Sequence, residues 1–136
     1  MSRLADLNGI VIPGRGLGAP RMSNSDITDR LAELVGFSLV PGTLNVRLPE
    51  PFERSLASLY IAASEISPEW EAETGQAGYF FLPVLVAGRY RCMAFQADEP
   101  GYPADQIELI GEVHFRSTLG LRDGDPIGLS VMATDR

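Results

Sequence analysis

Apolar residues along the chain fall in short runs that proline and glycine residues interrupt. Residues 7–12 form the first run, which ends at Pro13-Gly14 and predicts a strand. Residues 43–48 alternate between polar and apolar side chains before Pro49, as expected for a half-buried strand. Further strands are predicted at residues 79–86, 90–96, 107–113 and 126–132.

One segment has a helical rather than a strand period. Its apolar residues recur at i, i+4, i+7 and i+8, which places them on one face of a helix. These residues are Ile27, Leu31, Leu34 and Val35. Asp26 suits the first turn of that helix, and Gly36 suits the position just after its end. We therefore expect one substantial helix near residues 26–35.

Short strands, many turns and one substantial helix predict an all-β barrel. Ala87-Gly88 lies between two predicted strands and indicates a hairpin. Residues 56–66 fit a helix and a strand equally well, residues 115–120 predict one or two helical turns, and the polar, acidic residues 67–78 predict an exposed loop. Without a repeat or a linker in the sequence, residues 1–136 are expected to form one domain.

The charge of the chain limits the kinds of partner that we expect it to bind. The formal net charge is −7, and an acidic protein repels nucleic-acid backbones and anionic membrane surfaces. No apolar run approaches the ~18 residues that span a bilayer. We therefore expect neither nucleic acid nor a membrane as a partner. All 11 basic residues are arginines, so a Schiff-base lysine and a P-loop lysine are both excluded.

The single cysteine, Cys92, cannot form a disulfide within the chain. It lies in an apolar stretch and is expected to be a small core residue. Residues 1–7 lack the apolar stretch of a secretory signal, and together these features predict a cytoplasmic protein. Nothing in the sequence sets its oligomeric state.

A glycine-rich segment follows the first predicted strand. It consists of Gly14, Arg15, Gly16, Leu17, Gly18 and Ala19. Glycines expose backbone N–H groups and allow a phosphate to approach closely, which makes an anion-binding loop one interpretation. A mobile loop without a ligand is the alternative. The spacing matches neither the dinucleotide fingerprint nor the P-loop.

Thr43 and Asn45 share one face of their predicted strand, because side chains alternate along a strand. Two neutral oxygen side chains could bind Mg²⁺ whose remaining ligands are water and phosphate oxygens. The alternative is a turn followed by a strand with two solvated polar residues.

The combination of these motifs resembles the CTP-dependent riboflavin kinases, which are known mainly from archaea. The resemblance is carried first by Gly9-Ile10-Val11, the three glycines at 14, 16 and 18, Leu34-Val35-Gly36-Phe37 and Pro41-Gly42-Thr43-Leu44-Asn45. It continues through Leu82-Pro83-Val84, Tyr102-Pro103, Glu108-Leu109-Ile110, Phe115-Arg116 and the stretch from Leu119 to Asp125. It covers residues 7–131, with a poor match over residues 50–78.

The resemblance implies a closed six-stranded cradle-loop barrel. It also implies transfer of the γ-phosphate of CTP, or of another nucleoside triphosphate, to riboflavin, which gives FMN. Its nucleotide-binding residues would be those from Gly14 to Ala19 together with Val113, His114, Phe115 and Arg116. Thr43 and Asn45 would bind Mg²⁺, and Glu108 would bind the flavin.

Glu108 is also the candidate catalytic residue, because a carboxylate there could accept the proton of the substrate hydroxyl or orient that hydroxyl. The alternative for Glu108 is an outward-facing strand residue without a role. His114 is the only histidine, so it cannot build a metal cluster, and it is expected to pack or to be solvated. Arg116 is the arginine that we expect to contact phosphate.

Three positions depart from the family pattern. Gly111-Glu112 stands where the family usually has Ala-Pro, Ala19-Pro20 replaces basic and aromatic residues, and a flavin-contacting threonine expected near Pro100 is absent. The departures leave two alternatives open. One is a flavin or nucleotide sensor without catalysis. The other is a DNA-binding regulator, because residues 119–125 also resemble swapped-hairpin transcription factors, although the net charge of −7 opposes it.

Overall fold

The computed structural model describes residues 3–14, 25–57, 59–66 and 77–132. The strands are β1 (Arg3–Ile12), β2 (Leu44–Arg47), β3 (Leu59–Ala62), β4 (Gly78–Val86), β5 (Tyr90–Asp98), β6 (Gln106–Gly111) and β7 (Pro126–Met132). The helices are α2 (Ser25–Val35), the 3₁₀ helix η1 (Arg54–Leu56), α3 (Ala63–Ile66) and α5 (Phe115–Leu119). No helix in these ranges is long and apolar enough to cross a bilayer.

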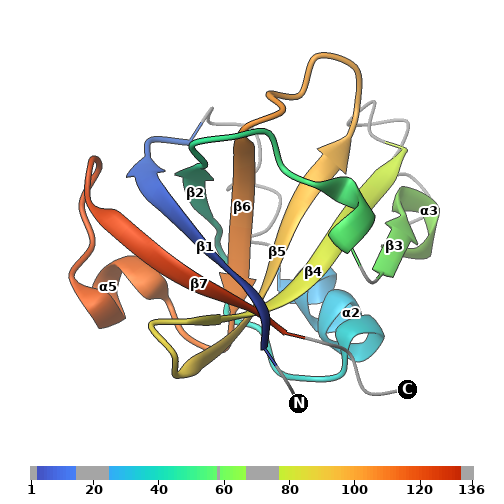
Figure 1. Ribbon diagram of the computed structural model, residues 1–136. Helices are drawn as coiled ribbons and strands as arrows, with labels where there is room; N and C mark the ends of the chain where they lie inside the picture. Colours follow the sequence, from blue (N-terminus) through green and yellow to red (C-terminus); the bar gives the residue numbers. More distant parts are fainter. Residues whose placement is uncertain (1–2, 15–24, 58, 67–76, 133–136) are drawn as a thin grey trace.

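Six strands close into an antiparallel barrel (Figure 1). Their order around the ring is β4-β5-β6-β2-β1-β7, and β7 returns to β4 through the pair Val84↔Val131. β3 pairs with β4 and extends the sheet outside the ring. The expected closed six-stranded barrel with one substantial helix is therefore confirmed.

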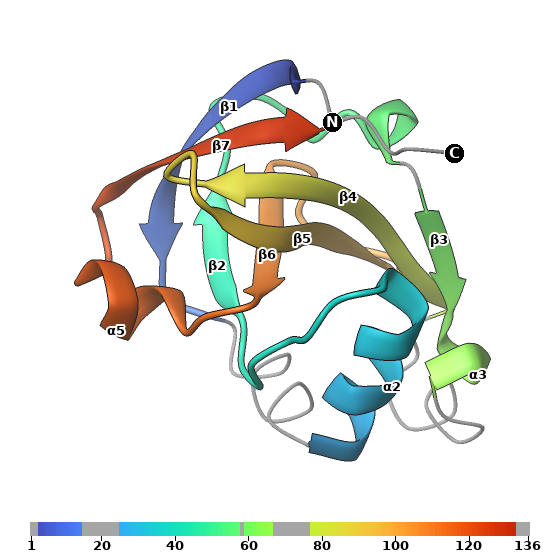
Figure 2. The same ribbon diagram turned by 90° about the horizontal axis from the view of Figure 1, so that it is seen from below.

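Alternation along the strands divides the apolar residues into two clusters. One fills the barrel interior and includes Val46, Ile107 and Leu109. The other includes Leu31 of α2 together with Phe81 and Phe95. Figure 2 shows α2 outside the ring of strands. Because two layers of apolar contacts cover the same strands, both faces of β5 and β6 are buried.

The aromatic residues of β4 lie on both faces of the strand. Tyr79 and Phe81 belong to the outer cluster under α2 rather than to the barrel interior. Tyr79 stands edge-on to Phe95 with ring centroids 5.6 Å apart. Phe80 faces the other way, and the guanidinium of Arg54 lies over its ring.

The turn signals are confirmed by backbone angles. Ala87 and Gly88 have φ values of 54° and 67°, the left-handed pair that a type I′ hairpin turn requires. Gly36 has a φ of 91°, and its N–H donates to Ala32 at the end of α2. By contrast, the ambiguous stretch 56–66 contains both kinds of element, since residues 59–62 form β3 and residues 63–66 form α3.

Candidate functional site

The candidate site lies where β2 pairs with β6. Asn45 stands directly opposite Glu108, and the neighbouring pair Leu44↔Leu109 points into the barrel. Asn45 and Glu108 therefore share the outer face of the sheet. Thr43 reaches the same face, where its hydroxyl donates to Glu108 Oε1 over 3.4 Å. The structure thus brings the two predicted metal ligands beside the predicted catalytic carboxylate.

These side chains are buried although they lie on the outside of the barrel. Glu108 is 7% exposed and Asn45 is 8% exposed. Asn45 is therefore not the solvated strand residue of the alternative interpretation. Tyr102 donates its hydroxyl hydrogen to Glu108 Oε2 over 2.8 Å. Buried polar groups of this kind are stabilised by such hydrogen bonds.

The oxygen atoms of the site suit a magnesium ion. Asn45 Oδ1 accepts a hydrogen bond from Gln106 Nε2 over 2.9 Å, which leaves the amide oxygen a second lone pair. The Thr43 hydroxyl supplies a second neutral oxygen, and the Glu108 carboxylate adds a negative charge nearby. Mg²⁺ usually keeps several waters and takes phosphate oxygens among its ligands, so a few protein oxygens are enough. The donors present therefore fit Mg²⁺.

Among residues 3–14, 25–57, 59–66 and 77–132, no group of three or more His, Cys, Asp or Glu side chains is placed to hold a metal ion. A cation at the Thr43–Asn45 site would therefore depend on oxygens that a phosphate-bearing ligand supplies.

The glycine-rich segment leaves the sheet next to this site. Ile12, the last residue of β1, is paired with Asn45. Gly14 follows and is exposed, whereas Arg15, Gly16, Leu17, Gly18 and Ala19 lie outside the described residues. The predicted phosphate loop thus begins beside the predicted metal ligands.

The second predicted nucleotide segment also approaches the site. A Cβ atom added at Gly42 would lie 3.9 Å from the His114 ring, so the residue before Thr43 adjoins the start of α5. His114 caps α5, and its Nδ1 accepts from the Ser117 N–H. The histidine is exposed, and this contact gives it a structural role at the start of the helix.

The neighbours of His114 have limited freedom to bind a ligand. Val113 is partly buried against the interior cluster. Phe115 is 4% exposed, so its backbone rather than its ring is available to a nucleotide. Arg116 already forms an ion pair with Asp123, which a phosphate would have to replace or share.

One departure from the family pattern has a local explanation. A Cβ at Gly111 would lie 2.5 Å from the Phe115 ring and 2.7 Å from the Arg91 carbonyl oxygen, so the packing admits only glycine. The adjacent Glu112 carboxylate accepts hydrogen bonds from Arg91 N over 2.8 Å and from Arg91 Nε over 3.2 Å. The backbone N–H of Arg91 is the main reason that the pKa of Glu112 lies below its ordinary value of 4.5.

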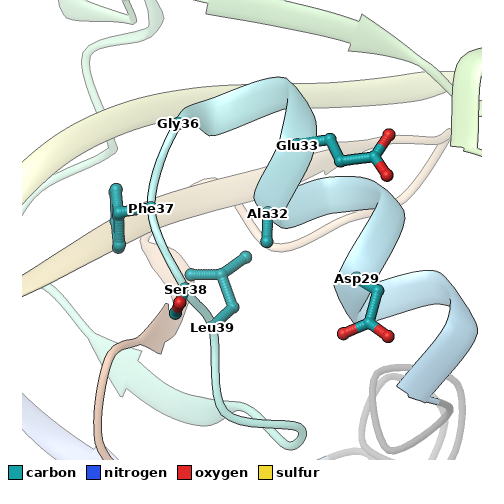
Figure 3. Close-up of a pocket in the computed structure, with 7 residues that line it drawn as sticks. All are labelled: Asp29, Ala32, Glu33, Gly36, Phe37, Ser38 and Leu39. Carbon is teal, nitrogen blue, oxygen red and sulfur yellow. The ribbon is translucent and has the colours of Figure 1, made fainter.

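A separate cavity of about 460 Å³ lies between α2 and the chain that follows it (Figure 3). Phe37 and Leu39 line it on one side, and Asp29 and Glu33 of α2 line it on the other. Its two carboxylates repel phosphate groups, and it contains no predicted site residue. We therefore do not assign the nucleotide to this cavity.

Sequence reasoning gave no role to Tyr102, Gln106 or Gln96. Tyr102 contacts Glu108, and Gln106 contacts Asn45. The one usable signal was the Pro100-Gly101 pair, which marks a turn just before Tyr102. The glutamine contacts depend on which strands become neighbours, and no local pattern carries that information.

The fold and the site define a class of protein: a small closed β-barrel with an oxygen-lined site beside a glycine-rich strand end. The profile of the CTP-dependent riboflavin kinase family, described as a domain of unknown function (DUF120), matches residues 11–131. The chain belongs to this family.

Three archaeal relatives carry the name riboflavin kinase. The protein from Methanocella arvoryzae is 33% identical over 126 residues, covering 92% of this chain and 56% of the relative. The protein from Methanococcoides burtonii is 33% identical over 135 residues, covering 96% of this chain and 58% of the relative. The protein from Halobacterium salinarum is 31% identical over 132 residues, covering 93% of this chain and 57% of the relative. The chain thus spans little more than half the length of these relatives.

Proposed function

We propose that this protein is a riboflavin kinase that transfers the γ-phosphate of a nucleoside triphosphate to the ribityl 5′-hydroxyl of riboflavin. CTP is the proposed donor, because the family is named for it. The observation that carries the proposal is the pair Asn45↔Glu108, since it sets proposed metal ligands beside a proposed proton acceptor. The relatives' shared name supports the same reaction.

In the proposed reaction, the ribityl hydroxyl oxygen forms a bond to the γ-phosphorus, and the bond from that phosphorus to the β–γ bridging oxygen breaks. The products are FMN and the nucleoside diphosphate. The hydroxyl proton passes to the Glu108 carboxylate, which Thr43 and Tyr102 hold in place. Phosphoryl transfer depends mainly on positioning and on charge stabilisation, so a site with few ionisable groups is sufficient.

The remaining residues bind the nucleotide. Thr43 and Asn45 would hold Mg²⁺, which neutralises phosphate charge when it is bound. Backbone N–H groups from Gly14 to Ala19 would bind the phosphates. Residues 113–116 would contact the rest of the nucleotide, with Arg116 exchanging part of its pairing to Asp123 for phosphate.

The proposal is tested by incubating the protein with riboflavin, Mg²⁺ and each of the four nucleoside triphosphates in turn, and by separating FMN from riboflavin. We expect FMN with CTP, and none when a chelator removes Mg²⁺. If the protein binds riboflavin and nucleotide but forms no FMN, it is a sensor and not a kinase. A gel shift with duplex DNA would instead support the alternative of a DNA-binding regulator.

A further inference from the structure

Tyr102 makes the shorter of the two hydroxyl contacts to Glu108. Its hydroxyl lies 2.8 Å from Oε2, whereas the Thr43 hydroxyl lies 3.4 Å from Oε1. A hydroxyl that donates to a carboxylate forms a charge-assisted hydrogen bond, which is stronger than a neutral one. Tyr102 also packs against the apolar cluster under α2, so its ring has a fixed place.

A tight turn delivers Tyr102 to this position. The Tyr102 N–H donates to the Glu99 carbonyl, and Gly101 between them has a φ of 81°. Proline followed by a glycine with positive φ is typical of the central pair of a type II turn. The turn reverses the chain after β5 and places the tyrosine just ahead of β6.

The segment between Tyr102 and Glu108 is anchored from inside the barrel. Gln96 is 1% exposed, and its Nε2 donates to the carbonyls of Ala104 over 3.0 Å and Gln106 over 2.8 Å. Gln96 Oε1 in turn accepts from Arg54 Nε over 3.0 Å. A buried amide with every group engaged holds its surroundings rigidly.

Backbone hydrogen bonds secure the same segment from its other side. Leu48 N donates to the Asp105 carbonyl over 2.7 Å, and Phe52 N donates to the Ala104 carbonyl over 2.8 Å. The loop after β5 is therefore anchored by side-chain and backbone hydrogen bonds, and Tyr102 extends from this anchored loop to Glu108.

We propose that Tyr102 is a positioning residue that holds the Glu108 carboxylate for catalysis. This inference rests on the proposed kinase function. Tyr102 binds Oε2 and Thr43 contacts Oε1, so the two hydroxyls fix the orientation of the carboxylate that receives the hydroxyl proton of riboflavin. Tyr102 itself does not touch the reacting atoms, and it acts through Glu108.

The test is Tyr102→Phe, which removes the hydroxyl and keeps the packing ring. We expect kcat to fall at least about tenfold while the KM for nucleotide is unchanged, since a hydrogen bond to a charged group is lost at the site of proton transfer. Tyr60→Phe is the matched control. The Tyr60 hydroxyl, on the strand outside the ring, donates to a carboxylate oxygen of Asp98 over 2.7 Å, so this variant should keep the wild-type kcat.

A double-mutant cycle separates positioning from a general structural effect. In the Glu108→Gln background, Tyr102→Phe should change kcat by less than about twofold, because residues that act together are not additive. Equal losses in both backgrounds would overturn the positioning role, and so would a wild-type kcat in Tyr102→Phe. If the wild-type protein makes no FMN at all, the kinase proposal is wrong and this inference falls with it.

Discussion

Asn45 of β2 lies directly opposite Glu108 of β6, and both side chains are buried on the outer face of the barrel. Leu44 and Leu109 beside them fill the interior, so a slip of one residue would exchange polar and apolar faces. The register of one strand pair therefore fixes the distance between the proposed metal ligand and the proposed proton acceptor.

Asn45→Ala should weaken binding of Mg²⁺-nucleotide, because it removes one of the proposed ligand oxygens. It should also lower the free energy of unfolding by about 1–3 kcal/mol, since the buried Gln106 amide loses its acceptor. Calorimetric titration with Mg²⁺-CTP and a denaturant melt measure the two effects. A sequence-based view of Asn45 as solvated would have predicted no change in stability.

Asn45→Asp is the control that separates these effects. A carboxylate oxygen at this position still accepts from Gln106, but it adds a second negative charge opposite Glu108. We expect the thermal midpoint of this variant to rise more steeply with Mg²⁺ concentration than that of the wild-type protein. A midpoint that does not respond to Mg²⁺ in either protein would argue against a cation at this pair.

Gln96→Leu should destabilise the fold by about 1–3 kcal/mol, because an apolar side chain removes the side-chain donor to the buried Gln106 carbonyl and one of the two donors to the Ala104 carbonyl. Arg54→Met is the matched comparison. It keeps an apolar stem over Phe80, and Arg54 is exposed, so water can replace its Nε. Denaturant melts that show Arg54→Met to be as costly as Gln96→Leu would contradict the anchoring role of Gln96.

Glu112→Gln should change the dependence of stability on pH. The backbone N–H of Arg91 lowers the pKa of Glu112 in the folded protein, so ionised Glu112 favours folding above its ordinary value of 4.5. This contribution is lost as the pH falls through the lowered pKa. The difference in unfolding free energy between the wild type and Glu112→Gln should therefore be largest near neutral pH and shrink in acid. A difference that is constant with pH would show that the charge of Glu112 is irrelevant.

Local patterns predicted most of the scaffold. The helical spacing of Ile27, Leu31 and Leu34 identified α2, and the strand at residues 126–132 has the predicted bounds. The Ala87-Gly88 hairpin and the Gly36 helix end also followed from backbone preferences of single residues. These elements are determined by residues close together in the sequence, so one amino-acid sequence is enough to predict them.

The environment of the site did not follow from local patterns. Asn45 alternates with apolar neighbours as a solvated residue would, yet it is covered on the outer face. Likewise, the contact of Tyr102 with Glu108 depends on the path of the loop after β5. Strand alternation and the family resemblance pointed to Thr43 and Asn45, the resemblance added Glu108, and only the strand order explains why they meet.

The most direct test of the account is the single-turnover rate of FMN formation by Glu108→Gln with saturating riboflavin and Mg²⁺-CTP. We expect a rate about 10²- to 10⁴-fold below that of the wild-type protein, with the affinity for nucleotide nearly unchanged, because Glu108 takes the proton and does not bind the phosphates. A wild-type rate in this variant would contradict the central claim that the Glu108 carboxylate, held opposite Asn45, carries the reaction.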